Sequence, residues 1–202
     1  TPRTSSAASD VYKRQAASQS KGFKFSVELG SELLLLGKKG CKTNDKEFID
    51  YIKQIENFNS QDDYDSWHHQ TIVNMTSGTD ELKELLNINN KSFNNYAYGI
   101  AAKILNCYLK VFFLESFGNQ KFADFIHPPV DAILLKALRK EDKTLFNFKD
   151  SIFIHIGVQK IPTWTRINEN EYKEIIKLMK EFLFSKDQNG LWKIESFWIG
   201  HQ

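Results

Sequence analysis

Lys103 and Asp131 are the two residues whose types and settings could together support covalent chemistry. Lys103 lies in GIAAKILN, just after an asparagine-rich stretch, and Asp131 lies in HPPVDAILLKAL, two positions after a pair of prolines. Each therefore stands near the start of an apolar run with helical spacing. A neutral lysine amine attacks electrophilic carbon and forms Schiff bases, and a carboxylate beside it orients the amine or stabilises developing positive charge. The two residues are a candidate nucleophile and its assisting carboxylate.

Each residue also has an ordinary structural interpretation. A lysine in the first turn of an amphipathic helix is usually exposed, and an aspartate that follows proline is a common N-cap. The catalytic interpretation rests on the joint occurrence, in order, of G-x-x-x-K at 99–103 and P-V-D at 129–131. A helix start adds unpaired N–H groups and a positive dipole end, which favour a bound phosphate and disfavour a charged amine.

Hydrophobic periodicity predicts the elements that would position these residues. The chain is expected to be mainly α-helical, with a short extended arm or hairpin formed by 21–29 and the leucines at 33–36. In the tail, Trp192, Phe197 and Trp198 are expected to pack against the body of the protein. Helical spacing of apolar residues predicts helices over 45–55, 63–75, 79–88, 99–113, 130–138 and 169–184.

The first 22 residues form a separate segment in this interpretation. They are rich in Ser and Ala and poor in large apolar residues, which is typical of disorder. Their opening TPRTSSAASDVYKRQ also resembles translated sequencing-adapter sequence, so residues 1–22 are interpreted as disordered or artefactual. Residues 23–202 are expected to form one helical domain, because a chain of this length can bury a single core.

Charge and cysteine content narrow the classes of partner. The net charge is only +2, but residues 91–140 carry six Lys and one Arg against three acids, a net +4 that fits a localised phosphate contact. The two cysteines, Cys41 and Cys107, form no C-x-x-C pair, so a zinc ribbon or an iron–sulfur cluster has no ligand set. No metal or other cofactor is expected. With neither a disulfide framework nor a long apolar run, we expect a cytoplasmic monomer that has no membrane partner.

The stretches 99–109 and 127–138 together resemble the core of the helix-hairpin-helix DNA glycosylases, the superfamily of endonuclease III and 8-oxoguanine glycosylase. Members carry a hairpin of the type G-V-G-x-K and a later buried helix that begins with P-V-D. The segment around Trp164, with the Tyr-bearing helix after it, also looks like some glycosylase-like proteins of environmental bacteria. The sequence departs from the family where Tyr96-Ala-Tyr98 replaces L-P-G and where Ala101 replaces the second hairpin glycine.

The resemblance implies a helix-hairpin-helix glycosylase-like helical fold and a set of site residues. Lys103 would attack the sugar C1′ of double-stranded DNA that carries a modified or damaged base, and Asp131 would assist it. The hairpin would bind the DNA backbone, and a pocket with aromatic faces would hold the base removed from the stack. The implied hairpin residues are Gly99, Ile100, Ala101 and Ala102, and the implied pocket residues are Tyr96, Tyr98, Phe122, Phe125 and His127.

The resulting functional hypothesis is a DNA N-glycosylase of the base-excision type, with or without abasic-site lyase activity. A rival from another class is a non-catalytic DNA-binding helical module in a repair or phage-defence system. A third is a helical protein without any role on nucleic acid. The first two differ in whether Lys103 reacts with the sugar or only neutralises phosphate, which a chemical test distinguishes.

Deletion of residues 1–20 should leave the melting temperature unchanged. These residues lack the apolar content needed to offset the entropy lost on ordering. The measurement is thermal unfolding of the chain with and without the segment. A large drop in melting temperature on deletion would contradict the interpretation of residues 1–22 as dispensable.

Overall fold

The structure is a computed structural model that describes residues 54–77, 97–110, 124–149, 152–153, 156 and 160–198. The contacts divide the chain into two compact units, residues 1–96 and residues 97–202. The boundary falls inside the asparagine-rich stretch. The predicted N-terminal arm, the helix over 79–88 and the disordered segment 1–22 lie outside the described residues, so they and the single domain over 23–202 stay predictions.

In the first unit, α4 (Gln61–Ser77) follows the short 3-10 helix η1 (Gln54–Asn57). Ser60 and Asp63 cap α4 reciprocally: the Asp63 N–H donates to Ser60 Oγ at 3.1 Å, and the Ser60 N–H donates to Asp63 Oδ2 at 3.2 Å. This capping lowers the pKa of Asp63 below its ordinary value, with the Ser60 hydroxyl as the largest cause. One stripe of α4 is buried, and its residues are Tyr64, His68, Thr71, Ile72 and Met75.

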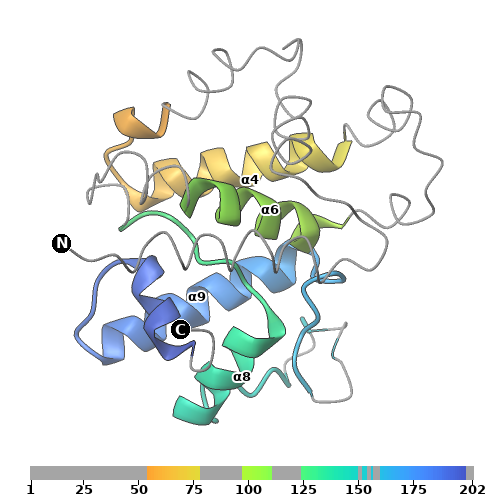
Figure 1. Cartoon of the computed structure of the whole chain (residues 1–202), viewed down its shortest axis with the longest axis vertical. Coiled ribbons are helices and arrows are strands. Elements are labelled where there is room, and N and C mark those ends of the chain that lie inside the picture. Colours follow the sequence, from red (N-terminus) through yellow and green to blue (C-terminus); the bar gives the residue numbers. More distant parts are fainter. Residues whose placement is uncertain are drawn as a thin grey trace, which may run out of the picture. The chain divides into compact units, whose positions relative to one another are not determined.

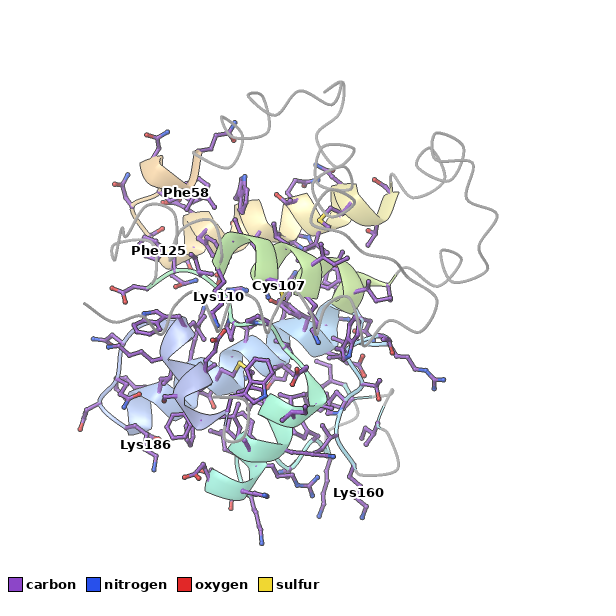
Figure 2. All side chains as sticks on the ribbon, viewed as in Figure 1. Phe58, Cys107, Lys110, Phe125, Lys160 and Lys186 are labelled. Atoms are coloured by element: carbon purple, nitrogen blue, oxygen red, sulfur yellow. The ribbon has the colours of Figure 1, made fainter. Side chains whose placement is uncertain are left out.

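In the described part of the second unit, the chain forms three α-helices and a 3-10 helix, which are drawn in Figure 1. The helices are α6 (Tyr98–Lys110), α8 (Ala132–Glu141) and α9 (Glu169–Ser185), and the 3-10 helix η4 spans Leu191–Phe197. Helix α9 packs against α6 and against η4, while α8 packs against η4. The side chains of the unit are drawn in Figure 2, where Cys107 and Lys110 lie on α6.

Among the described helices of the second unit, α9 contributes the most buried apolar residues. Asn168 caps it with a capping box: its side chain accepts from the Glu171 N–H, and the Glu171 carboxylate accepts from the Asn168 N–H. The cap fixes the helix start and thereby the direction of the buried face. Phe182 at the far end of this face makes edge-to-face ring contacts with Phe146 and Phe197. The other buried apolar residues of α9 are Tyr172, Ile175, Ile176, Leu178, Met179 and Leu183.

The turn before α9 lies directly against the start of α6, and Gly99 makes this approach possible. The Gly99 N–H donates to the Ile167 carbonyl at 2.9 Å. A Cβ at position 99 would lie only 2.2 Å from the Trp164 carbonyl oxygen and 2.9 Å from Ile167 Cβ. Backbone at this distance leaves room for glycine alone. Gly99 therefore joins the turn around residues 163–167 to α6 one helical turn before Lys103.

The mainly helical character predicted from the sequence is confirmed for the described part of the chain. Among the residues that the structure describes, β pairing is limited to one antiparallel bridge between Ile156 and Pro162. The helix predicted over 169–184 is observed with almost the same ends. The helix predicted over 130–138 begins two residues later, because Asp131 has extended backbone angles and caps it. None of the described helices is long and apolar enough to cross a membrane.

The aromatic tail behaves only partly as predicted. Trp198 is buried and Phe197 contacts the Phe182 ring, as expected, whereas Trp192 stays 40% exposed. The difference follows from the 3-10 helix η4, whose geometry directs Leu191 and Ile194 inward at a spacing of three and leaves Trp192 outside. Apolar character alone could not identify which of these residues faces the core.

Replacement of Gly99 by Ala should destabilise the protein, although alanine is the better helix former. The added Cβ meets backbone rather than a movable side chain, so we expect a loss of about 1–3 kcal/mol in the free energy of unfolding. Chemical denaturation measures it. The control Asn170→Ala changes an exposed α9 residue and should stay within about 0.5 kcal/mol. A Gly99→Ala protein as stable as the control would contradict the close approach.

Candidate active site

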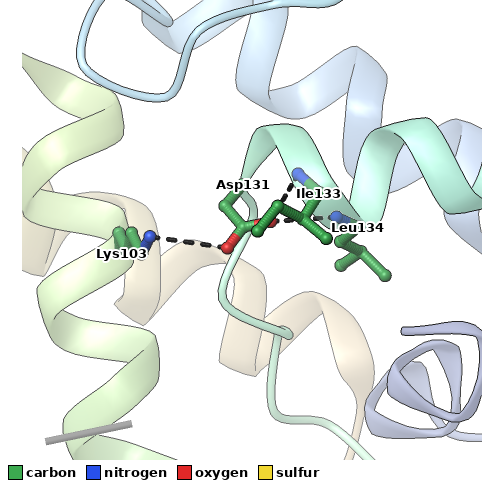
Figure 3. Close-up of polar contacts among 4 residues, drawn as sticks. All are labelled: Lys103, Asp131, Ile133 and Leu134. Carbon is green, nitrogen blue, oxygen red and sulfur yellow. Dashed lines mark hydrogen bonds and ion pairs between the residues drawn. The ribbon is translucent and has the colours of Figure 1, made fainter. Parts of the chain in front are cut away.

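The structure brings the side chains of Lys103 and Asp131 together from two elements. Lys103 projects from α6, and Asp131 stands directly before α8, 28 positions later in the chain. Lys103 Nζ lies 3.6 Å from Asp131 Oδ2, as the dashed line in Figure 3 marks. The two side chains therefore face each other across the space between α6 and the start of α8, whereas their chemical roles stay predictions.

Asp131 is held in place by the helix that it caps. Its Oδ1 accepts hydrogen bonds from the Ile133 and Leu134 N–H groups, both at 2.9 Å (Figure 3). These bonds use one carboxylate oxygen and fix the plane of the group, so that Oδ2 points to Lys103. The ordinary N-cap interpretation of Asp131 is thus correct, and it does not exclude the second role. The hydrogen bonds of the cap orient the carboxylate toward Lys103.

Lys103 is almost fully enclosed. The residue is 9% exposed, and the side chains of the ion pair are 10% and 4% exposed for Lys103 and Asp131. Removing an ammonium from water is costly unless an opposite charge and other favourable contacts replace the lost hydration. Asp131 supplies the charge, and the Trp164 indole supplies an aromatic face whose centre lies 4.4 Å from Nζ. This setting differs from the exposed lysine that a solvated helix face would give.

Lys103 lies deeper in its helix than the sequence suggested. Helix α6 begins at Tyr98, so Lys103 is in the second turn rather than at the start. Its immediate surroundings are the Asp131 carboxylate and the Trp164 ring, and not the unpaired N–H groups of a helix end. The expected influence of the helix N-terminus on the amine is replaced by that of a counter-ion and an aromatic face.

The four residues assigned to a DNA-binding hairpin form the first turns of α6. Gly99, Ala101 and Ala102 are buried, and Ile100 is partly exposed. The Gly99 N–H donates to the Ile167 carbonyl, and the N–H groups of Ile100 and Ala101 donate to the Ala97 carbonyl. These donors are already used within the protein. A direct phosphate contact through them stays a prediction.

The residues assigned to a base pocket fall into three groups. Tyr98 and His127 both pack against the Tyr172 ring, with centroid distances of 5.5 Å and 5.9 Å. Phe125 is partly exposed in the segment that leads to His127. Tyr96 and Phe122 lie outside the described residues. The structure thus gathers part of the predicted set around Tyr172, which the sequence analysis did not include among the site residues.

Three residues that contact either Lys103 or the segment before Asp131 were not among the predicted site residues. Trp164 covers the amine, and Asn106 and Tyr172 are buried and joined by a hydrogen bond of 2.9 Å. Asn106 left a signal in the sequence, because it is polar within an apolar helix and lies three positions after Lys103, on the same helix face. The segment around Trp164 entered the resemblance, but no sequence pattern placed its ring beside Lys103, which lies 61 positions earlier in the chain.

Cys107 lies one helical turn beyond Lys103 and is a free thiol. The residue is partly exposed, but burial of the thiol raises its pKa to about 11, an effect that the Lys103 charge partly opposes. Farther along α6, Lys110 forms an ion pair with Glu195 of η4. Within the described ranges, no cluster of three or more His, Cys, Asp or Glu residues could hold a metal ion.

The chain matches no protein-family model, and no curated protein or solved structure is significantly similar to it. The interpretation of the Lys103–Asp131 pair therefore depends on its own geometry and on the motif residues that carry it.

The Cys107 thiol should react slowly with alkylating reagents at pH 8. The thiolate is the reactive form, and a pKa of about 11 instead of the ordinary 9.0 lowers its fraction about a hundredfold at this pH. Alkylation by iodoacetamide, followed by peptide mass spectrometry, measures the Cys107 rate separately from that of Cys41. The unfolded chain in denaturant is the control. Equal Cys107 rates in the folded and unfolded protein would contradict the buried thiol.

Proposed function

We propose that this protein is a DNA N-glycosylase with a helix-hairpin-helix glycosylase-like fold, in which Lys103 attacks C1′ of a nucleotide bearing a modified or damaged base. The observation that carries the proposal is the enclosed ion pair, with Lys103 Nζ 3.6 Å from Asp131 Oδ2. An amine and a carboxylate that meet in a largely buried position are the groups required for nucleophilic attack and for its assistance. The choice of this reaction rests on the resemblance of the G-x-x-x-K and P-V-D motifs to those of the DNA glycosylases.

The reaction begins with transfer of a proton from the Lys103 ammonium, for which Asp131 Oδ2 is the carboxylate oxygen beside the amine. The neutral Nζ then forms a bond to C1′, and the bond between C1′ and the base breaks. The base leaves with the bonding electron pair and takes up the proton that Asp131 carried. When the bond between C1′ and O4′ opens, O4′ takes a second proton from Nζ, and an iminium between Nζ and C1′ remains.

The burial of Lys103 favours an enzyme over a non-catalytic DNA-binding module. A lysine that serves only to neutralise phosphate acts at the surface, where its charge meets the DNA backbone. Lys103 is instead 9% exposed, and its charge is balanced by Asp131. The Trp164 ring beside the amine offers an aromatic face of the kind on which a base removed from the stack is held. Both features support chemistry at Nζ.

Borohydride trapping on DNA with an abasic site tests the proposal directly. The reductant converts the iminium into a stable amine, so the wild-type protein should become covalently linked to the DNA. Lys103→Ala should give no linked product because the nucleophile is absent. Asp131→Asn keeps a capping side chain but loses the charge, so trapping should slow by about 10²–10³-fold. The rate of linkage is followed by denaturing gel electrophoresis, and DNA affinity is measured separately.

The matched control is Lys110→Ala, which removes another ion-paired lysine from the same helix and should leave trapping unchanged. Thermal unfolding shows whether each variant is folded. The proposal is wrong if wild-type protein binds abasic DNA and forms no linkage, and if it also releases no base from a broad panel of modified duplexes. Binding that falls as lysines are removed, without any base release, would identify the non-catalytic DNA-binding module instead.

A further inference from the structure

The segment that carries Asp131 is buried and has few hydrogen-bond donors of its own. Residues 126–131 are all buried, and Pro128 and Pro129 have no N–H group. A buried carbonyl in such a segment needs a donor from elsewhere. The Pro128 carbonyl receives one from Asn106, whose Nδ2 lies 2.9 Å away. Asn106 is itself 0% exposed, so this bond lies entirely inside the second unit.

Tyr172 extends this contact into a chain of hydrogen bonds. Asn106 Nδ2 also donates to the Tyr172 hydroxyl at 2.9 Å. Because that oxygen accepts from the amide, its own hydrogen can be directed to His127 Nδ1, which lies 3.1 Å away. The segment is thus attached at two successive residues, His127 through Tyr172 of α9 and Pro128 through Asn106 of α6. Both attachments come just before Asp131.

The spacing of these contacts connects them to the ion pair. Asn106 follows Lys103 by three positions on one face of α6, and Pro128 precedes Asp131 by three positions. The same helix face therefore meets the same segment twice, at Lys103 with Asp131 and at Asn106 with Pro128. The amide contact fixes how far along α6 the segment lies, and this in turn determines whether the Asp131 carboxylate reaches the Lys103 amine.

We infer that Asn106 and Tyr172 are positioning residues for the Lys103–Asp131 pair. They touch neither side chain of the pair in any described contact, and they act by holding residues 127–128 against α6 and α9. Their effect on a reaction rate rests on the proposed function. Their effect on the enclosure of Lys103 does not, so the two effects can be measured separately.

The first measurement is the rate at which an amine-reactive acetylating reagent labels Lys103, read by peptide mass spectrometry. In the wild type, Asp131 and Trp164 enclose the amine, so labelling should be slow. Asn106→Ala and Tyr172→Phe should each accelerate labelling of Lys103 several-fold, because the segment that encloses it is released. Lys173 and Lys177, with side chains 55% and 62% exposed, are internal references that should not change. Asn147→Ala, which removes side-chain hydrogen bonds in a distant turn, is the control variant.

The second measurement is the single-turnover rate of borohydride trapping on saturating abasic DNA. Asn106→Ala should lower this rate by up to about 10²-fold, the effect of a displacement near 1 Å, while DNA affinity stays the same. In an Asp131→Asn background the same substitution should have little further effect, because the carboxylate being positioned has lost its charge. A general loss of structure would instead lower the rate by the same factor in both backgrounds.

The outcomes separate the two hypotheses. Tyr172→Phe removes one hydroxyl and keeps the ring that packs against Tyr98 and His127, so a folded variant remains even if Asn106→Ala fails to fold. If Asn106→Ala or Tyr172→Phe accelerates the labelling of Lys103 while the wild type traps no DNA, the positioning role is supported and the proposed function is overturned. A wild type that traps DNA, with Tyr172→Phe unchanged in both trapping and labelling, overturns the positioning role alone.

Discussion

Enclosing the Lys103 amine requires a fixed negative charge beside it, and the arrangement of the second unit around this site depends on that requirement. Asp131 meets it with one carboxylate oxygen while the other caps α8. The cap consists of two hydrogen bonds from backbone N–H groups. The carboxylate therefore cannot turn away from the amine without leaving these N–H groups of α8 without their acceptor. One side chain thus joins the start of one helix to the side of another.

Two further contacts determine what surrounds the amine. Gly99 lets the backbone of the turn around residues 163–167 contact the backbone of α6. Trp164, from this turn, places its ring over the amine of Lys103, which lies one helical turn after Gly99 in α6. Asn106 in turn holds the segment 126–131, which contains both prolines and Asp131, against the same helix. Lys103 therefore lies between two segments that are each attached to α6 by a neighbour in the helix. This explains how a short stretch of sequence, 99–106, organises residues that are distant in the chain.

In the structure, the residues that carry the helix-hairpin-helix resemblance differ in what they contact. The glycine of the motif is required for close packing, and the N–H groups that a hairpin would offer to phosphate are bonded inside the protein. The lysine and the aspartate of the motif are brought together, each in a setting that suits the proposed reaction. What supports the proposed function is therefore the Lys103–Asp131 pair and not the N–H groups of the hairpin.

The sequence by itself determined the local features: the helix over 169–184, the Asp131 cap and the pairing of two motifs, since periodicity and capping act within a few residues. It also singled out Lys103 and Asp131. Only the tertiary structure decided that Lys103 lies in a second turn under Trp164, that Trp192 is exposed, and that Asn106 and Tyr172 hold the Asp131 segment. These facts depend on how helices and turns far apart in the chain pack. Hydrophobic spacing specifies which face of a helix is buried, but not which distant residue is packed against it.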